Sequence, residues 1–325
     1  MMNYDEFKEA FIKSFEDYIN ENYSNYVINT ESVLKNNITL DGLSLRREGD
    51  KIAPVVYLNY LYEDYISGKE IKDLVEHISQ MMIDSITNKN DLVKDVSMSD
   101  FTYDYCKDKI VFNICNSQLN QDILDKRPNR AFNDLSITYK VLIGKKNDIT
   151  ASVPIDNNLA QHIGINEEQL YQLAYENTKI LMPTTINSMD QVIDFNQIDI
   201  DSNDILEQDM LWVISNSKKF NGASAMLYTE DLSKLADKLD ADLYIIPSSV
   251  DEVLAVSAKS MIASDVNYLK EMVSEVNKTL EPEMLLSNEV YTFDKQSHKI
   301  TIAESSSVRN EDKSFDDIPF KRKSR

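Results

Sequence analysis

The chain has 325 residues with 34 basic and 55 acidic side chains, so its formal net charge at pH 7 is −21. This charge repels the phosphates of nucleic acids and anionic lipid headgroups, which excludes ordinary nucleic-acid binding through counterion release. Glycine occurs only six times, and no two glycines have the spacing of a loop that closes around a phosphate.

The N-terminal region predicts a helix followed by a strand pair. Asn3 and Glu6 have the spacing of a capping box, and apolar residues at helical spacing extend the predicted helix over residues 4–21. Alternating residues predict strands over 26–35 and 38–47, and two asparagines lie between them, where a turn is needed.

The next region mixes helices and strands. Pro54 predicts the start of an apolar helix that ends at Gly68, and a second helix follows over residues 69–86. Strands are predicted over 110–115 and 134–143. Asn166 and Gln169 form another capping-box pattern, which opens a helix that Pro183 terminates after Leu181.

The C-terminal region predicts the order ββαββαββ. Hairpins dominate this order, so we expect mainly antiparallel sheets and an α+β fold. The helices begin after the expected caps Thr229 and Ser264, and the strands are predicted over 210–215, 223–228, 242–246, 252–257, 290–293 and 299–303.

Length and composition predict two domains or subdomains. A chain of this length exceeds the usual limit of one hydrophobic core, about 250–300 residues. Residues 187–208 are acidic and lack periodicity, which indicates a connection. We therefore expect an N-terminal part over 1–186, a C-terminal part over 209–303 and a disordered tail over 304–325.

Cysteine and histidine usage predicts neither a disulfide framework nor a metal site. Cys106 and Cys115 are expected to be buried free thiols, and no histidine has zinc-ligand spacing. Residues 199–210 begin like a calcium loop, but Asp204 replaces the required Gly and Met210 replaces the final Glu. We expect no cofactor, no membrane span and a cytoplasmic location.

Two predicted turns carry the candidate site residues. Ser and Asp at a strand turn either bind a ligand or close the turn through local hydrogen bonds, and the pattern leaves both readings open. In the first turn, over 217–222, the candidates are Lys218, Lys219 and Asn221. In the second turn, over 247–252, they are Ser248, Ser249, Asp251 and Glu252.

Several stretches in order resemble the uncharacterised bacterial domain-of-unknown-function family 5688. They are KNNITLDGLSLRREGDKIAPVVYLNYLYEDYISG, RPNRAFNDLSITYKVL, EEQLYQLAYENTKILMP, ISNSKKFNGASAMLY, DLYIIPSSVDEVLAVSA and EMVSEVNKTLEPEMLLSNEVYTFD. The resemblance brings no activity. It implies a histidine after the proline equivalent to Pro128 and another before the glutamate equivalent to Glu252. Here Asn129 and Asp251 stand at those positions, which favours a member without catalysis.

Three functions fit the sequence. The first is a non-catalytic binding or regulatory protein, such as one that serves a mobile element, whose protein partner would present a basic surface. The second is an enzyme with a site at the turn over 247–252. The third is an acidic mimic of nucleic acid that inhibits a nucleic-acid-binding protein.

Overall fold

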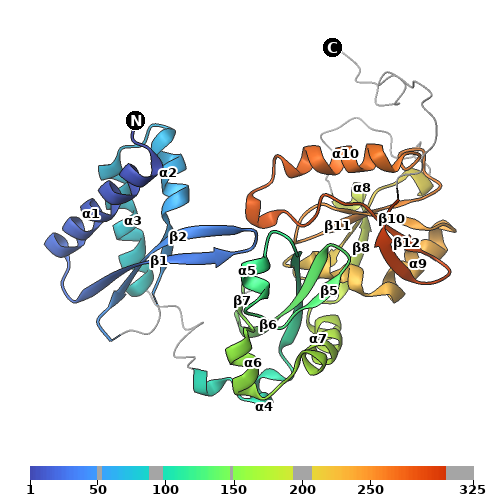
Figure 1. Ribbon diagram of the computed structural model, residues 1–325, viewed down its shortest axis with the longest axis horizontal. Helices are drawn as coiled ribbons and strands as arrows, with labels where there is room; N and C mark the ends of the chain where they lie inside the picture. The colour runs from blue at the N-terminus through green and yellow to red at the C-terminus, as the bar shows by residue number, and fades with distance from the viewer. Residues whose placement is uncertain (50–52, 88–97, 147–148, 193–206, 305–325) are drawn as a thin grey trace, which may run out of the picture.

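The computed structural model describes residues 1–49, 53–87, 98–146, 149–192 and 207–304. The fold is α+β, and its three sheets are antiparallel. Figure 1 shows an N-terminal unit, residues 4–87, beside a larger body, residues 98–304. The tip of one hairpin of the N-terminal unit reaches the body.

The N-terminal unit is a three-stranded sheet covered by helices. Its elements are α1 (Tyr4–Asn22), β1 (Tyr26–Lys35), β2 (Ile38–Arg47), β3 (Val55–Tyr57), α2 (Leu58–Ile66) and α3 (Ile71–Thr87). The capping box at Asn3 is confirmed, and β1 pairs with β2 in register from Tyr26 with Arg47 to Lys35 with Ile38. The prediction that one helix starts at Pro54 was wrong, because residues 55–57 pair with β2 as β3.

The core of the N-terminal unit forms because apolar side chains recur along one face of α1. Phe7, Phe11, Phe15 and Ile19 are fully or almost fully buried and pack with side chains of α2 and α3. Every buried member of this cluster lies between Phe7 and Ile86. Among the described residues, no buried hydrophobic cluster spans both the N-terminal unit and the body.

The first half of the body holds a four-stranded sheet in which β6 is central. The predicted strands over 110–115 and 134–143 are found as β4 and β6, although β6 ends three residues later than predicted, and the capping box that opens α7 is confirmed. The elements in chain order are η2 (Met98–Asp100), α4 (Tyr103–Cys106), β4 (Ile110–Asn116), α5 (Gln121–Leu124), β5 (Arg130–Phe132), β6 (Leu135–Lys146), β7 (Ile149–Pro154), α6 (Asn157–Ile163) and α7 (Glu167–Leu181).

The second half of the body holds a six-stranded antiparallel sheet in the order β13-β12-β10-β11-β9-β8. Its elements in chain order are β8 (Thr184–Ser188), α8 (Met189–Val192), η5 (Glu207–Asp209), β9 (Trp212–Asn216), η6 (Gly222–Leu227), α9 (Thr229–Leu239), β10 (Leu243–Pro247), β11 (Val253–Ser257), α10 (Val266–Asn277), η7 (Pro282–Met284), β12 (Tyr291–Asp294) and β13 (Lys299–Ile302). The strands β10 and β11 pair as an antiparallel hairpin, and so do β12 and β13.

The predicted strand over 223–228 was wrong, because residues 222–227 form the 3-10 helix η6. All six of its residues are buried, a pattern that a strand with one exposed face does not give. Two predicted helix caps were also wrong. Thr229 is the first residue of α9, and Asp265 rather than Ser264 caps α10 by accepting from the Asn267 N–H.

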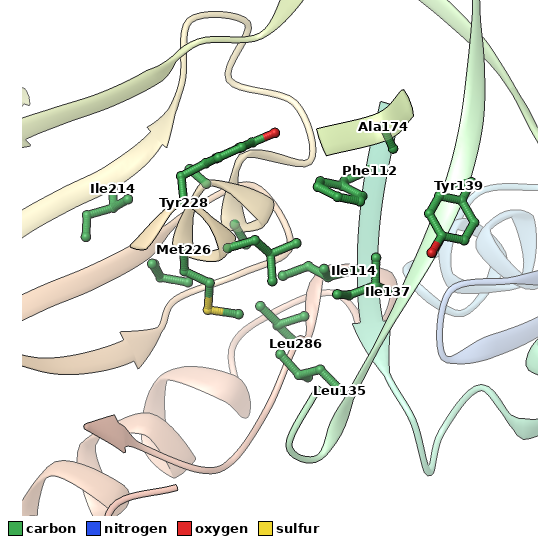
Figure 2. Close-up of a cluster of buried hydrophobic side chains, with 14 of the residues drawn as sticks. Phe112, Ile114, Leu135, Ile137, Tyr139, Ala174, Ile214, Met226, Tyr228 and Leu286 are labelled. Carbon is green, nitrogen blue, oxygen red and sulfur yellow. The ribbon is translucent and has the colours of Figure 1, made fainter. Parts of the chain in front are cut away.

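The largest hydrophobic cluster joins both halves of the body. Its buried members run from Phe101 to Phe293, and Figure 2 shows Ile114, Ile137 and Leu286 beside Met226 of η6. Strand β8 precedes the predicted connection over 187–208 and pairs with β9, which follows it. Residues 193–206 of that connection, which include residues 199–206 of the calcium-like stretch, lie outside the described residues. The same holds for residues 305–325 of the tail predicted over 304–325. The division over 187–208 stays a prediction.

Candidate functional site

The two turns predicted to carry a site lie against each other. The Asn221 N–H donates to Asp251 Oδ1 at 2.7 Å, and Ser215 Oγ donates to the Asp251 carbonyl at 2.7 Å. Gly222 makes this approach possible, because a Cβ there would lie 2.1 Å from Ser215 Oγ and 2.3 Å from the Asp251 carbonyl oxygen. Asn221 and Asp251 are therefore held together as one polar corner of the body.

The hydroxyls of the second turn close the turn itself. The Asp251 N–H donates to Ser249 Oγ at 3.1 Å, and the Ser249 N–H donates to the Glu252 carbonyl at 3.1 Å. Ser248 Oγ donates to Glu252 Oε1 at 3.5 Å. These groups form the local bonds that small polar residues make in ordinary turns.

The first turn has an unusual backbone and carries two lysines. Lys219 has φ 51° and Asn221 has φ 48°, both in the left-handed region that few residues other than glycine adopt. The Lys218 N–H donates to Asn216 Oδ1 at 2.9 Å, and Lys219 is exposed. Phe220 lies between Lys219 and Asn221, and its ring lies beside a lysine of the four-stranded sheet.

That lysine is Lys140 on β6. Side chains alternate along a strand, and Ile137, Tyr139 and Val141 all join the main hydrophobic cluster. Lys140 therefore projects from the opposite face, together with the buried hydroxyls of Ser136 and Thr138. Its Nζ lies 5.2 Å from the centroid of the Phe220 ring, at cation–π distance.

Two further cations act on Lys140. Burial lowers the pKa of Lys140 to about 8, and the positive charge of Arg127, which follows α5, is the next cause. Asp251 and Cys115 act in the opposite direction, while Lys35 at the end of β1 lowers the pKa further. We refer to Lys35, Arg127 and Lys140 as the cationic cluster; all three are partly buried.

The carboxylates of Asp251 and Asp156 act on the cationic cluster through their charge, on Lys140 and Arg127 respectively, without pairing directly with these cations. Neither Arg127 nor Lys140 forms an ion pair within 4.0 Å or a side-chain hydrogen bond with any of the described residues. Burial also lowers the pKa of Arg127, so desolvation acts on both cations. Cys115 does not supply a negative charge, because burial raises the pKa of its thiol to about 11.

A neighbouring arginine shows how this chain otherwise satisfies a partly buried cation. Arg130 donates to both carboxylate oxygens of Glu167, at 3.1 Å and 2.9 Å, and to Glu168 at 2.6 Å. Glu167 also accepts from the hydroxyl of Tyr139. This complete network is structural, and it contrasts with Arg127 three residues earlier.

One serine–histidine pair among the described residues lacks the setting of a nucleophile. Ser233 Oγ lies 2.6 Å from Nδ1 of His298, but it also donates to the Thr229 carbonyl at 2.7 Å within α9. A serine held inside a helix in this way lacks the exposed turn of a nucleophile. Within the described ranges no three His, Cys, Asp or Glu residues are grouped to hold a metal, and no helix is long and apolar enough to cross a membrane.

An open hollow of about 470 Å³ lies where the N-terminal unit meets α5. Both strands of the β1–β2 hairpin contribute to it, as do α5 and the residues after it. Its lining residues are Ser32, Leu34, Thr39, Asp122, Asp125 and Lys126. Lys35 and Arg127 are therefore each adjacent in sequence to a residue of this hollow.

Sequence reasoning missed all three cations of the cluster. One signal was present, because SITYK alternates polar and apolar residues and places Lys140 on the face of Ser136 and Thr138. Asn129, where the family resemblance implies a histidine, donates from Nδ2 to the carbonyls of Leu124 at 3.0 Å and Arg127 at 2.8 Å. Asn129 therefore contacts the backbone of Arg127, and Asp251 acts on Lys140 through its charge.

Comparison with known proteins gives a family and nothing closer. No curated protein and no solved structure matches the chain. A family model described as a family of unknown function, DUF5688, matches residues 4–295. Because this match covers the N-terminal unit and nearly the whole body, the chain belongs to the DUF5688 family.

Proposed function

We propose that this protein is a non-catalytic binding protein that takes up a small oxyanion, a phosphate or carboxylate group, at the cationic cluster. One observation carries the proposal: Arg127 and Lys140 are partly buried, and neither forms an ion pair within 4.0 Å with a carboxylate of the described residues. Burying like charges together is costly, and an oxyanion would offset that cost. Arginine suits this role, because its planar fork matches carboxylate and phosphate oxygens.

The net charge of the whole protein favours a small anion over a long polyanion as the ligand. A net charge of −21 repels long polyanions, whereas a small anion can approach a local cationic site. All three cations are partly exposed, so solutes can reach them. Phe220 adds an apolar wall beside the Lys140 ammonium.

The two turns support binding rather than catalysis. The Ser249 hydroxyl and the Asp251 carboxylate accept bonds from the backbone of the turns, so they shape this corner. An activated nucleophile would instead bond to a base held by a third group. We also propose a cytoplasmic location, because the buried free thiols Cys106 and Cys115 suit a reducing compartment.

Calorimetric titration of the purified protein with sodium phosphate and with sodium citrate tests this function. Arg127→Met and Lys140→Met should each weaken binding by roughly tenfold or more, because a hydrogen bond to a charged group contributes about 1.5–3 kcal/mol. Lys299→Met removes an exposed lysine of β13 and should leave the affinity unchanged. Circular dichroism checks that each variant is folded.

Two outcomes would contradict the proposal. If neither phosphate nor citrate binds the wild-type protein, the cationic cluster is not an oxyanion site. If Lys219→Met removes binding while Lys140→Met does not, the ligand belongs to the turn over residues 217–222 instead.

A further inference from the structure

The N-terminal unit docks on the body through polar contacts at the tip of the β1–β2 hairpin, which reaches the body in Figure 1. Asn37 donates from Nδ2 to the carbonyls of Pro282 at 2.8 Å and Leu285 at 2.7 Å. Asn36 Nδ2 donates to the Glu283 carbonyl at 2.7 Å. The turn that closes the hairpin therefore also holds the N-terminal unit on the body.

On the side of the body, Asn120 before α5 completes these contacts. Its Oδ1 accepts from the Asn37 N–H at 2.8 Å, and its Nδ2 donates to Asn37 Oδ1 at 2.6 Å. Asn120 is buried, with 2% of its surface exposed. Tyr60 of α2 adds a bond from its hydroxyl to Glu283 Oε2 at 2.5 Å. We call the bonds that Asn36, Asn37 and Tyr60 make with the body the latch.

Each part has its own hydrophobic core, and the latch joins the two parts through polar groups. The buried members of the N-terminal core end at Ile86, and those of the main core of the body begin at Phe101. Among the described elements, the pairs of helices and strands that pack most extensively all lie within one part. Parts of a chain move relative to each other unless their interface is large and hydrophobic. Water can replace the bonds of the latch, so their net contribution to docking is modest.

Asn37 serves the turn and the latch with different atoms. Its φ of 62° lies in the left-handed region, which asparagine adopts more readily than most residues. Glycine would suit this backbone equally well, but it has no side chain to bond with the body. Asn25 has a similar backbone, with φ 67°, at an exposed position before β1. The latch can therefore be weakened by a substitution that has a matched control in the same unit.

We propose that the latch opens reversibly, so that the N-terminal unit exchanges between a docked and an undocked position while both cores stay folded. The open hollow described above has walls from the β1–β2 hairpin and from α5, so it exists only in the docked position. The undocked position instead exposes Asn120 and the carbonyls of residues 282–285 to solvent. A ligand that fills the hollow would favour docking. This exchange does not depend on the anion site proposed above.

Hydrogen exchange of the wild-type protein detects the undocked position even when it is rare. The Asn37 amide donates to Asn120 across the junction, whereas the Leu45 amide donates to the Pro54 carbonyl inside the N-terminal unit. The Leu142 amide donates to a carbonyl inside the body. The protection factor of Asn37 should be at least about tenfold lower than those of Leu45 and Leu142, because undocking exposes Asn37 without unfolding either core.

Two variants weaken the latch from opposite sides. Asn37→Gly keeps the left-handed turn and removes the side-chain bonds, and Asn120→Ala removes their partner on the body. Each should lower the protection factor of the amide at position 37 roughly tenfold, as loss of one or two hydrogen bonds does. The Leu45 and Leu142 amides should keep their protection, which shows that both cores are folded. Asn25→Gly is the matched control and should change none of the three amides.

Distances between spin labels separate undocking from local opening of the turn. Lys13→Cys on α1 and Lys299→Cys on β13 place one label at an exposed position of each part, while the native thiols are buried. We expect one narrow distance to dominate in the labelled protein with an intact latch. A second, broader population should appear in Asn37→Gly and in Asn120→Ala, but not in Asn25→Gly.

Any one of three results would overturn the proposal. Equal protection of the Asn37, Leu45 and Leu142 amides would show that the latch opens only when the cores unfold. An unchanged label distance in both latch variants would show that the two parts form one rigid body. Protection of Asn37 that rises with protein concentration would show that docking occurs between two copies rather than within one chain.

Discussion

Lys140 differs from the paired lysines of this acidic chain in its surroundings. Lys8 lies 2.8 Å from Asp41, and Lys270 lies 2.7 Å from Glu289, so each has a carboxylate within contact distance. Lys140 has an aromatic ring, a neutral thiol and a second cation around it, and Asp251 acts on it through its charge without an ion pair within 4.0 Å. This environment makes its charge unusually sensitive to pH and to bound anions.

Binding of citrate should weaken as pH rises through about 8. The pKa of Lys140 is lowered to about 8, so its amine loses the proton that attracts the anion within the range pH 7.5–10, where citrate stays fully ionised. The groups that act on it are Arg127, Asp251, Cys115 and Lys35, and the Cys115 thiol, with a pKa of about 11, stays largely protonated. Affinity measured by calorimetry should fall roughly tenfold over this range.

A charge that does not titrate provides the control for this pH dependence. Lys140→Arg keeps a positive charge throughout the range, because arginine stays protonated in proteins, and should flatten the profile. Lys140→Met should bind weakly at every pH. A wild-type affinity that is constant from pH 7.5 to 10 would show that Lys140 does not hold the anion.

At the scale of single elements, local signals predicted most of the fold. The hairpin β1–β2 and the helices α1 and α7 were predicted to within one residue, because capping boxes and regular alternation are written in neighbouring residues. The 3-10 helix η6 and the strand β3 were missed, because tertiary contacts decide both. Residues 55–57 pair with β2 although their composition also suits a helix.

The candidate site was predictable only in part. The turn residues stood out because serine, aspartate and asparagine mark turns, and the structure brings Asn221 to Asp251 across 30 positions of the chain. Arg127, Lys140 and Lys35 gave no such signal individually. Their interest comes from burial, and for Arg127 and Lys140 from the lack of an ion pair within 4.0 Å among the residues that the structure describes, and sequence spacing contains neither property.

Gly222→Ala should destabilise the protein by about 1–3 kcal/mol, the usual cost of an added group in a closely packed place. The new Cβ would clash with Ser215 Oγ and with the backbone of Asp251, so β9 and the second turn would have to separate. Thermal unfolding measures this effect. Ser217→Ala, at an exposed position of the same turn, is the comparison and should change the melting temperature little. Equal melting temperatures for the two variants would contradict the close approach.

The whole molecule combines a strongly negative charge with a local cationic site. Counterion release requires many Lys and Arg contacts to phosphates, and 34 basic residues are outnumbered by 55 acidic ones. Repulsion by the rest of the surface acts on a long polyanion along its length, whereas a small anion experiences mainly the nearest charges within a Debye length of about 8 Å. The protein should therefore distinguish anions by size.

Duplex DNA should show no gel shift at about 150 mM salt, the ionic strength of that Debye length. Phosphate or citrate should bind under the same conditions, which makes the two measurements a matched pair. A clear shift with generic DNA would show that the cationic cluster overcomes the surrounding negative charge. In that case the ligand class would have to include nucleic acids.

The separate cores of the two parts set an order of events during synthesis. The N-terminal core is complete once Ile86 has been made, whereas the main core of the body needs Phe293, roughly two hundred residues later. At about 5–20 residues per second the ribosome needs roughly 10–40 s to cover that distance. During this time the N-terminal unit can already be compact while Asn36 and Asn37 still lack the carbonyls of residues 282–285. Docking of the hairpin is therefore among the last steps in the maturation of the nascent chain.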